Sequence, residues 1–275
     1  MLKMIDYWRA TEPSVFGLYH IICILIVIAV SILLIKKVKN PTDKTLNKLL
    51  LIFSIVMLVL EVYKELTYMT SYDEVTQTYD YDWYAFPFQF CSTTMYIMLI
   101  AGLLKPGKFK DAMLAFLASY SLFGGLTVFA YPEQVFVERV GINFQTMVHH
   151  GSQIVVGCYL LGSNVVKFNY KTLIKGTYVF VALFFIALAM NIIVYNTGIA
   201  NGESFNMFYV GPYYECTLPL VSLFYPKEFT IIKYLLFLCI YVFGFIAASG
   251  AVLALGYGLK RLIILIQNKL VKNNN

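Results

Sequence analysis

Long apolar segments recur along the whole chain, and the short polar connections between them carry most of the charged residues. A helix rises about 1.5 Å per residue, so about 20 residues cross the roughly 30 Å hydrocarbon layer of a membrane. The pattern predicts seven such helices, at residues 17–35, 46–66, 87–104, 111–131, 143–162, 173–197 and 231–258. We therefore expect an all-α, polytopic membrane protein that forms a single transmembrane domain over residues 1–275.

A further stretch, 206–225, is apolar and aromatic, but Pro212 and Pro219 lie inside it and Pro226 follows it. Proline removes a helical hydrogen bond and clashes with the preceding turn. Irregular backbone at membrane depth must be buried in protein or line a cavity. The sequence therefore predicts a re-entrant or interfacial segment here rather than an eighth straight span.

Composition excludes an ordinary soluble domain. Hydrophobic residues make up 60% of the chain and charged residues 13%, and the mean hydropathy is +0.72. A soluble protein of this length cannot bury so large an apolar fraction.

Lysine and arginine are unevenly distributed among the predicted connections. Fifteen of the 21 basic residues lie at 36–48, 105–110, 167–175 and 260–272. Because positive charges in short connections stay in the cytoplasm, we expect an N-terminus outside and a cytoplasmic C-terminus. The net charge of +6 then reflects topology and contact with anionic lipids, with no nucleic-acid partner.

Four of the predicted helices place polar side chains near the outer face of the membrane. By helical rise, Cys91 lies about 6 Å below Pro87, and His149 and His150 lie about 10 Å below the start of their helix. Ionisable groups inside a bilayer cost about 2.5–3.5 kcal/mol each, so a shared depth predicts a cavity open toward the outer leaflet. The residues expected to bind substrate there are Glu61, Glu65, Gln89, Thr94, Asn191, Asn196 and Asn206. In the alternative reading, these groups reach the interface or hydrogen-bond between helices, and Lys64 neutralises the glutamates.

Five cysteines occur, at positions 23, 91, 158, 216 and 239. None has CxxC spacing, so neither a zinc site nor a redox dithiol is indicated, and we expect no metal and no cofactor. Cys91 differs from the others because Gln89 and three hydroxyl residues, Ser92 to Thr94, surround it. The start of a helix also adds positive potential, which favours a thiolate.

The adjacent histidines admit three readings: an interhelical hydrogen bond, a general base, or a metal ligand. Neighbouring residues on a helix point about 100° apart, so His149 and His150 cannot easily face one ligand. Because both histidines lie at nearly the depth of Cys91, one of them can accept the proton of its thiol and later return that proton to a leaving group.

Three short motifs occur in an order that resembles a known family. A Pro-x-x-x-Cys-Ser motif occupies 87–92, Val148-His149-His150-Gly151-Ser152 follows, and Asn206-Met207-Phe208 comes last. With the hydropathy profile over about residues 15–260, this order resembles the YwaF-like family of bacterial integral membrane proteins. That family is similar to the human transmembrane cysteine acyltransferase of ether phospholipids and, more remotely, to the androgen-induced intramembrane lipid hydrolases.

The resemblance implies a lipid-directed enzyme in a bacterial plasma membrane, with Cys91 as nucleophile and His150, the histidine before a small residue, as base. The chain departs from the family pattern at Gln89 and Phe90, where a leucine and a histidine are expected. A second histidine, His149, leaves the choice of base open.

We therefore favour a transmembrane Cys–His acyltransferase or hydrolase that acts on membrane phospholipids through an acyl-cysteine intermediate. One alternative is a substrate-binding module or transporter, in which the polar cluster and the acidic, tyrosine-rich segment 72–84 capture a solute. Another is a structural assembly factor, whose polar groups and small-residue face at 247–251 hold helices together.

The lysine distribution generates a test of orientation. A membrane-impermeant thiol reagent added to intact cells should label a cysteine introduced at Thr76 and should not label one introduced at Thr42. The opposite labelling pattern would contradict both the orientation and a site in the outer leaflet.

Overall fold

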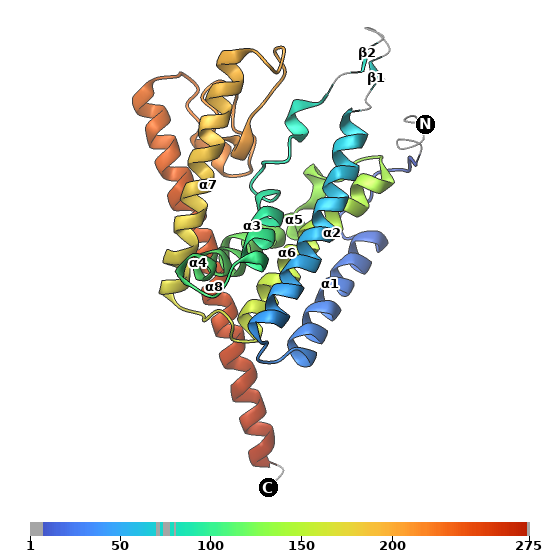
Figure 1. Cartoon of the computed structure of the whole chain (residues 1–275), viewed down its shortest axis with the longest axis vertical. Helices are drawn as coiled ribbons and strands as arrows, with labels where there is room; N and C mark the ends of the chain where they lie inside the picture. Colours follow the sequence, from blue (N-terminus) through green and yellow to red (C-terminus); the bar gives the residue numbers. More distant parts are fainter. Residues whose placement is uncertain (1–7, 70–71, 74–77, 80, 274–275) are drawn as a thin grey trace.

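The structure is a computed structural model, which describes residues 8–69, 72–73, 78–79 and 81–273 (Figure 1). Its helices are α1 (Leu18–Lys37), α2 (Asp43–Met69), α3 (Thr93–Leu103), α4 (Lys108–Phe116), α5 (Leu122–Ala130), α6 (Val140–Gly162), α7 (Tyr170–Thr197) and α8 (Ile231–Asn273). Two strands of two residues each, β1 (Tyr72–Asp73) and β2 (Thr78–Tyr79), form an antiparallel pair. The predicted all-α class is confirmed, while Glu74 and Asp80 of the acidic segment lie outside the described residues.

Five helices of the described chain are long and apolar enough to cross a membrane: α1, α2, a continuous helix from Lys108 to Ala130, α7, and Ile231–Ile266 of α8. The other two predicted spans do not qualify. Helix α3 has 11 residues, too few to cross alone. Helix α6 has 23 residues but carries several polar side chains, among them both histidines and two glutamines. The structure thus supports a membrane protein with five candidate spans, and the predicted seven spans are not confirmed.

The third predicted helix does not begin at Pro87. Residues 87–92 form turns, and α3 begins at Thr93, so Cys91 lies just before the helix and not one turn inside it. Tertiary contacts explain the difference. The ring of Phe88 stacks on that of Phe208 at 6.2 Å between centroids, and the Gln89 amide binds the main chain of Asn206 and Phe208.

The helix from Lys108 to Ala130 forms the centre of the bundle. In its most apolar 18-residue stretch, 72% of the residues are buried, compared with 11–33% in the other four candidate spans. Those four helices therefore face the surroundings of the protein. A π-helical turn at Leu117–Ser121 joins α4 to α5, a feature that often marks functional sites. Helix α6 packs beside α5 and is itself mostly buried.

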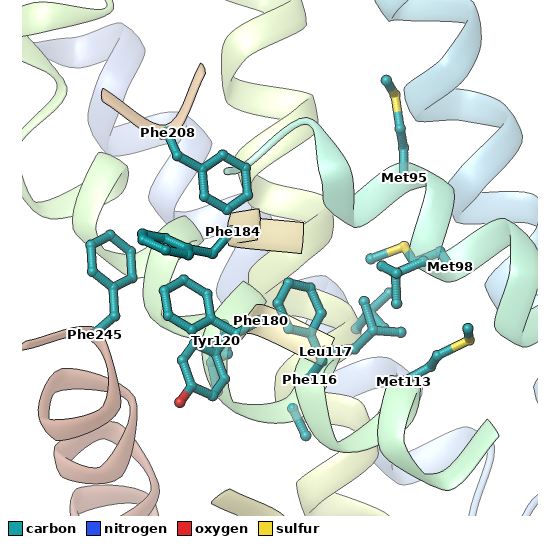
Figure 2. Close-up of a cluster of buried hydrophobic side chains, with 14 of the residues drawn as sticks. Met95, Met98, Met113, Phe116, Leu117, Tyr120, Phe180, Phe184, Phe208 and Phe245 are labelled. Atoms are coloured by element: carbon teal, nitrogen blue, oxygen red, sulfur yellow. The ribbon is translucent and has the colours of Figure 1, made fainter. Parts of the chain in front are cut away.

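An aromatic cluster anchors the turn that precedes α3. The ring of Phe90 meets the rings of Phe116, Phe180, Phe208 and Phe245 edge-on, at centroid distances of 5.0–6.3 Å. Figure 2 places these four partners together, although they come from four separate segments of the chain. Edge-to-face pairs each add about 0.5–1.5 kcal/mol beyond their buried area. The cluster therefore fixes the residue that immediately precedes Cys91.

The two ends of the molecule differ. The pair β1–β2 and the chain from 198 to 230 lie at one end, and the connection between α1 and α2 lies at the other with the C-terminal end of α8 (Figure 1). The 198–230 segment contains the short 3-10 helices Met207–Tyr209 and Val221–Phe224. No described helix in it is long enough to cross a membrane.

Close packing of α5 on α6 generates a stability test. A Cβ atom added at Gly125 would lie 2.8 Å from the main-chain oxygen of His150 and 3.0 Å from Cβ of Gln153. Since a helical carbonyl cannot rotate away, Gly125→Ala should destabilise the protein by about 1–3 kcal/mol, the usual cost of overpacking. The measurement is the midpoint of thermal unfolding in detergent.

Gly244→Ala in α8 is the matched control, because no atom outside its own helical backbone lies within 4 Å of the added Cβ. It should leave the midpoint unchanged or raise it slightly, since alanine favours helix over glycine. Equal midpoints for the two variants would contradict the described α5–α6 contact.

Candidate functional site

A cavity of about 310 Å³ lies between α2, α5, α6, α8 and the turn before α3. Its polar lining residues include Glu61, Lys64, Gln89, Cys91, His149 and His150. Phe90, Phe208, Tyr241 and Phe245 supply apolar wall. The structure therefore brings together the thiol, both imidazoles, one predicted glutamate and Gln89.

The main-chain carbonyl oxygen of Cys91 accepts hydrogen bonds from three N–H groups. They come from the backbone of Thr94 at 3.2 Å, Nε2 of His149 at 3.2 Å, and Nε2 of Gln153 at 3.0 Å. Because a carbonyl only accepts, the hydrogen of the His149 ring must be on Nε2. Helix α6 thus holds the Cys91 turn through two side chains.

The two histidines use their rings differently. Nδ1 of His150 lies 2.8 Å from the carbonyl oxygen of Thr146 and therefore donates to it. Its Nε2 then carries the free lone pair. In His149 the free lone pair is on Nδ1, which is buried and has no hydrogen-bond partner among the described residues. His149 is 2% exposed and His150 is partly exposed, so His150 is the better placed of the two to accept a proton in the cavity.

A buried group of charges supports His149 from α2. Glu61, whose side chain is 4% exposed, accepts from Nζ of Lys64 at 2.5 Å and from Nε2 of Gln145 at 3.1 Å. Nδ1 of His149 lies 3.9 Å from the same carboxylate. With its hydrogen on Nε2, the ring cannot donate from Nδ1 to this carboxylate, and Nδ1 has no hydrogen-bond partner among the described residues. The bond from Nε2 to the Cys91 carbonyl therefore orients the ring.

Two of these residues, Gln145 and Gln153, were missed by the sequence analysis. With His149 they form a stripe at intervals of four residues on one face of α6, and all three are at most 4% exposed. The signal was present in the sequence: polar residues at positions i, i+4 and i+8 of an apolar helix share one face.

Two predicted residues near this group lie outside the cavity lining. Glu65 accepts from the Tyr81 hydroxyl at 2.6 Å and pairs with Lys64 at 3.3 Å. The Thr94 hydroxyl is fully buried and has no hydrogen-bond partner among the described residues.

The three predicted asparagines hold the chain that follows α7. Asn191 bonds both the N–H and the carbonyl of Met207, at 2.7 and 2.9 Å. The side chain of Asn206 binds the main chain of Gly211, Tyr214 and Glu215. Asn196, which is exposed, binds the Ile192 carbonyl and the Tyr213 hydroxyl. None of the three lines the cavity.

Gln89 and Asn191 clamp the segment 206–208 from opposite sides, each with one donor and one acceptor. Phe208, which lies in the clamped segment, and Tyr209, which follows it, have φ angles of 57° and 56°. Non-glycine residues in this region cost roughly 1–3 kcal/mol and persist where surrounding contacts enforce them. Both residues line the cavity, so the clamp shapes its wall. Burial raises the pKa of the Tyr209 hydroxyl to about 12, which keeps it neutral.

Among the residues that the structure describes, all five cysteines are free, and no group of three His, Cys, Asp or Glu side chains could hold a metal ion. Cys23 and Cys158 are half-buried, Cys216 is buried and Cys239 is exposed. None of these four lines the cavity that contains Cys91.

Fold and cavity together define a class: a helical membrane protein with several apolar spans and an internal cavity that holds a thiol beside two imidazoles. The model of the TMEM164 family matches residues 15–257, and the chain belongs to that family. Membership is consistent with a lipid-related membrane protein, while the narrower YwaF-like assignment is not confirmed. Comparisons with curated proteins and with solved structures give no match.

The buried charges generate a test that uses two glutamates on one helix. Glu61→Gln removes the carboxylate that faces Lys64, Gln145 and His149. Loss of one partner of a buried ion pair costs about 3–5 kcal/mol, so the thermal unfolding midpoint in detergent should fall clearly.

Glu65→Gln is the matched control. The Glu65 side chain is 19% exposed, and its carboxylate lies 3.3 Å from Lys64, farther than that of Glu61, and accepts from Tyr81, so its replacement should cost less. A Glu65 variant less stable than the Glu61 variant would show that the network is not centred on Glu61.

Proposed function

We propose that the protein transfers or hydrolyses acyl chains of membrane phospholipids through an acyl-cysteine intermediate on Cys91. The observation that carries this proposal is the shared cavity of Cys91 and His150, in which the ring nitrogen Nε2 of His150 keeps a free lone pair. A thiol needs a neighbouring base to become a nucleophile, and a base needs a third group to orient it. The Thr146 carbonyl is that third group.

In the proposed reaction, Nε2 of His150 takes the proton of the Cys91 thiol. The sulfur attacks the ester carbonyl carbon of a phospholipid, an S–C bond forms, and the C–O bond to the glycerol breaks. His150 returns its proton to the departing lysophospholipid oxygen. A second lysophospholipid or water then attacks the thioester and regenerates the thiol, so neither a cofactor nor a metal is required.

The surroundings of the cavity favour a lipid as substrate. Aromatic walls formed by Phe90, Phe208 and Phe245 suit an acyl chain, whereas the polar wall suits the ester and head group. The site lies within a bundle of apolar helices, where a phospholipid is the most abundant ester. Family membership is consistent with this reading.

We further propose that the chain crosses the plasma membrane of a bacterium an odd number of times, with the end bearing β1 and β2 outside. In that orientation the short α3 and the polar α6 complete the two remaining crossings inside the bundle. A site toward the outer leaflet would not meet cytosolic acyl-CoA, so another phospholipid is the acyl donor.

Purified protein incubated with phospholipid should gain one acyl mass, and that adduct should map to Cys91. Cys91→Ala and Cys91→Ser should abolish the adduct, because neither alanine nor an unactivated hydroxyl replaces the thiolate. His150→Gln should slow turnover by about 10²–10⁴, the usual contribution of a general base. His149→Gln should lower it less.

Cys158→Ala is the matched control, since Cys158 lies on α6 but not in the cavity, and it should keep full activity. A well-folded Cys91→Ala variant that retains lipid turnover would rule out the mechanism. Saturable phospholipid binding without turnover would instead favour a substrate-binding module.

A further inference from the structure

The cavity that contains Cys91 opens to the surroundings of the protein on one side. Its lining residues on α2 and α6 are buried or half-buried. The exposed lining residues are Thr127 on α5, Tyr131 and Gln134 just beyond that helix, and Pro219 on the chain before α8. Since a lining residue that is also exposed marks the mouth of a cavity, the mouth lies between the end of α5 and the chain around Pro219.

This cavity lies at membrane depth. Tyr241 and Phe245 of α8 line it, and α8 carries no charged residue over 234–259. About 20 helical residues cross the hydrocarbon layer, and every such stretch within 234–259 includes both aromatic residues. Across the mouth, Thr127 also lies inside a candidate span, Lys108–Ala130. The cavity therefore opens at the depth of the lipid acyl chains.

Residues 218–224, here called the portal segment, have two different faces. Leu218 and Pro219 line the cavity. On the other face, three large apolar side chains are 54–78% exposed: Leu220, Leu223 and Phe224. An exposed apolar patch of this kind marks contact with a partner or with a membrane.

The exposed face of the portal segment continues the lipid-facing surface of α8. The ring of Tyr225, the next residue, packs edge-on against Phe237 of α8 at 5.1 Å between centroids. In the same turns of α8, the side chains of Ile232, Leu235 and Leu236 are 53–77% exposed. They belong to a candidate span, so the lipid that covers them also reaches the portal segment.

The backbone of the portal segment suits an apolar environment. The N–H groups of Val221, Ser222 and Tyr225 donate to carbonyls of the segment itself, at 2.8, 2.9 and 3.1 Å, and backbone groups in hydrocarbon must be satisfied in this way. Leu220 has a φ angle of 66°, which is strained for leucine, and its side chain is 77% exposed. Burial of this side chain therefore requires a partner outside the protein.

We propose that the portal segment inserts into the bilayer beside the cavity and that phospholipid enters sideways, its acyl chain passing between Pro219 and Thr127 to reach Cys91. This inference deepens the proposed function, on which it rests for the identity of the substrate. The partner of the exposed face is the acyl-chain region of the membrane, because α8 presents a continuous apolar surface to it. Lateral entry keeps the acyl chain in an apolar environment throughout, so the chain does not have to cross water.

The first measurement places the portal segment. Leu223→Trp is made in protein whose two tryptophans, Trp8 and Trp83, are replaced by phenylalanine, and the protein is reconstituted in phosphatidylcholine vesicles. Bromine on the lipid acyl chains should quench most of the fluorescence, whereas aqueous iodide should quench little. Strong quenching by iodide and none by brominated lipid would place the segment in water and overturn the proposal.

The second measurement tests entry through the mouth. Thr127→Trp fills the opening, so labelling of Cys91 by N-dodecylmaleimide dissolved in the vesicle membrane should slow several-fold, as measured by mass spectrometry of the Cys91 peptide. Leu126→Trp is the matched control, because Leu126 is the neighbouring exposed residue of α5 and does not line the cavity. Its labelling rate should equal that of the wild-type protein. Equal rates for the two variants, or no labelling of wild-type Cys91, would overturn entry by this route.

Neither measurement requires turnover, so the two proposals fail separately. If brominated lipid quenches the Leu223→Trp variant and Thr127→Trp slows labelling, but no acyl adduct forms on wild-type Cys91, acyl transfer fails and lateral entry stands. If the adduct forms but neither expected effect is seen, lateral entry fails and acyl transfer stands.

Discussion

The main-chain carbonyl of Cys91 is the point on which the site depends. In an apolar bundle an unpaired polar group is costly, so the turn that carries the thiol must find partners within the protein. Those partners are side chains of α6, His149 and Gln153, and His149 in turn faces Glu61 on α2. The position of the thiol is thereby linked to two long helices that lie far from it in sequence. The proposed mechanism depends on this link, because a loosely held loop could not keep the Cys91 thiol at a fixed distance from His150.

The opposite side of the same turn is fixed by apolar contacts and by an amide clamp. Phe90 is enclosed by four aromatic rings from four segments, and Gln89 binds the main chain at 206–208. This arrangement explains why the chain before α3 is not helical: a helix from Pro87 would point these two side chains away from their partners. It also explains why the strained backbone at Phe208 persists, because the clamp and the ring contacts oppose its relaxation.

The lengths of the apolar segments predicted where helices occur, because a helix buried in lipid and a helix buried in protein both require a long apolar segment. It could not predict that α3 is short, since the contacts of Phe88, Gln89 and Phe90 involve chain more than 100 residues away. Depth along predicted helices grouped Cys91 with the two histidines and Glu61, and these four residues line one cavity. The asparagines shared that depth but point to the 206–215 chain instead, because equal depth does not fix the direction of a side chain around its helix. Gln145 and Gln153 were missed, although they lie at intervals of four residues from His149 on one face of α6.

Adjacent histidines on a helix are best understood through the angle between them. Because neighbouring residues on a helix point about 100° apart, the two rings cannot easily bind one ligand, but they can contact two different groups. Nε2 of His149 donates to the Cys91 carbonyl, whereas its Nδ1 has no hydrogen-bond partner among the described residues and lies 3.9 Å from Glu61. His150 donates from Nδ1 to the Thr146 carbonyl of its own helix, and the residue lines the cavity. Each ring has one nitrogen that donates to a main-chain carbonyl, Cys91 for His149 and Thr146 for His150. The proposed mechanism assigns positioning of the Cys91 turn to His149 and proton transfer to His150.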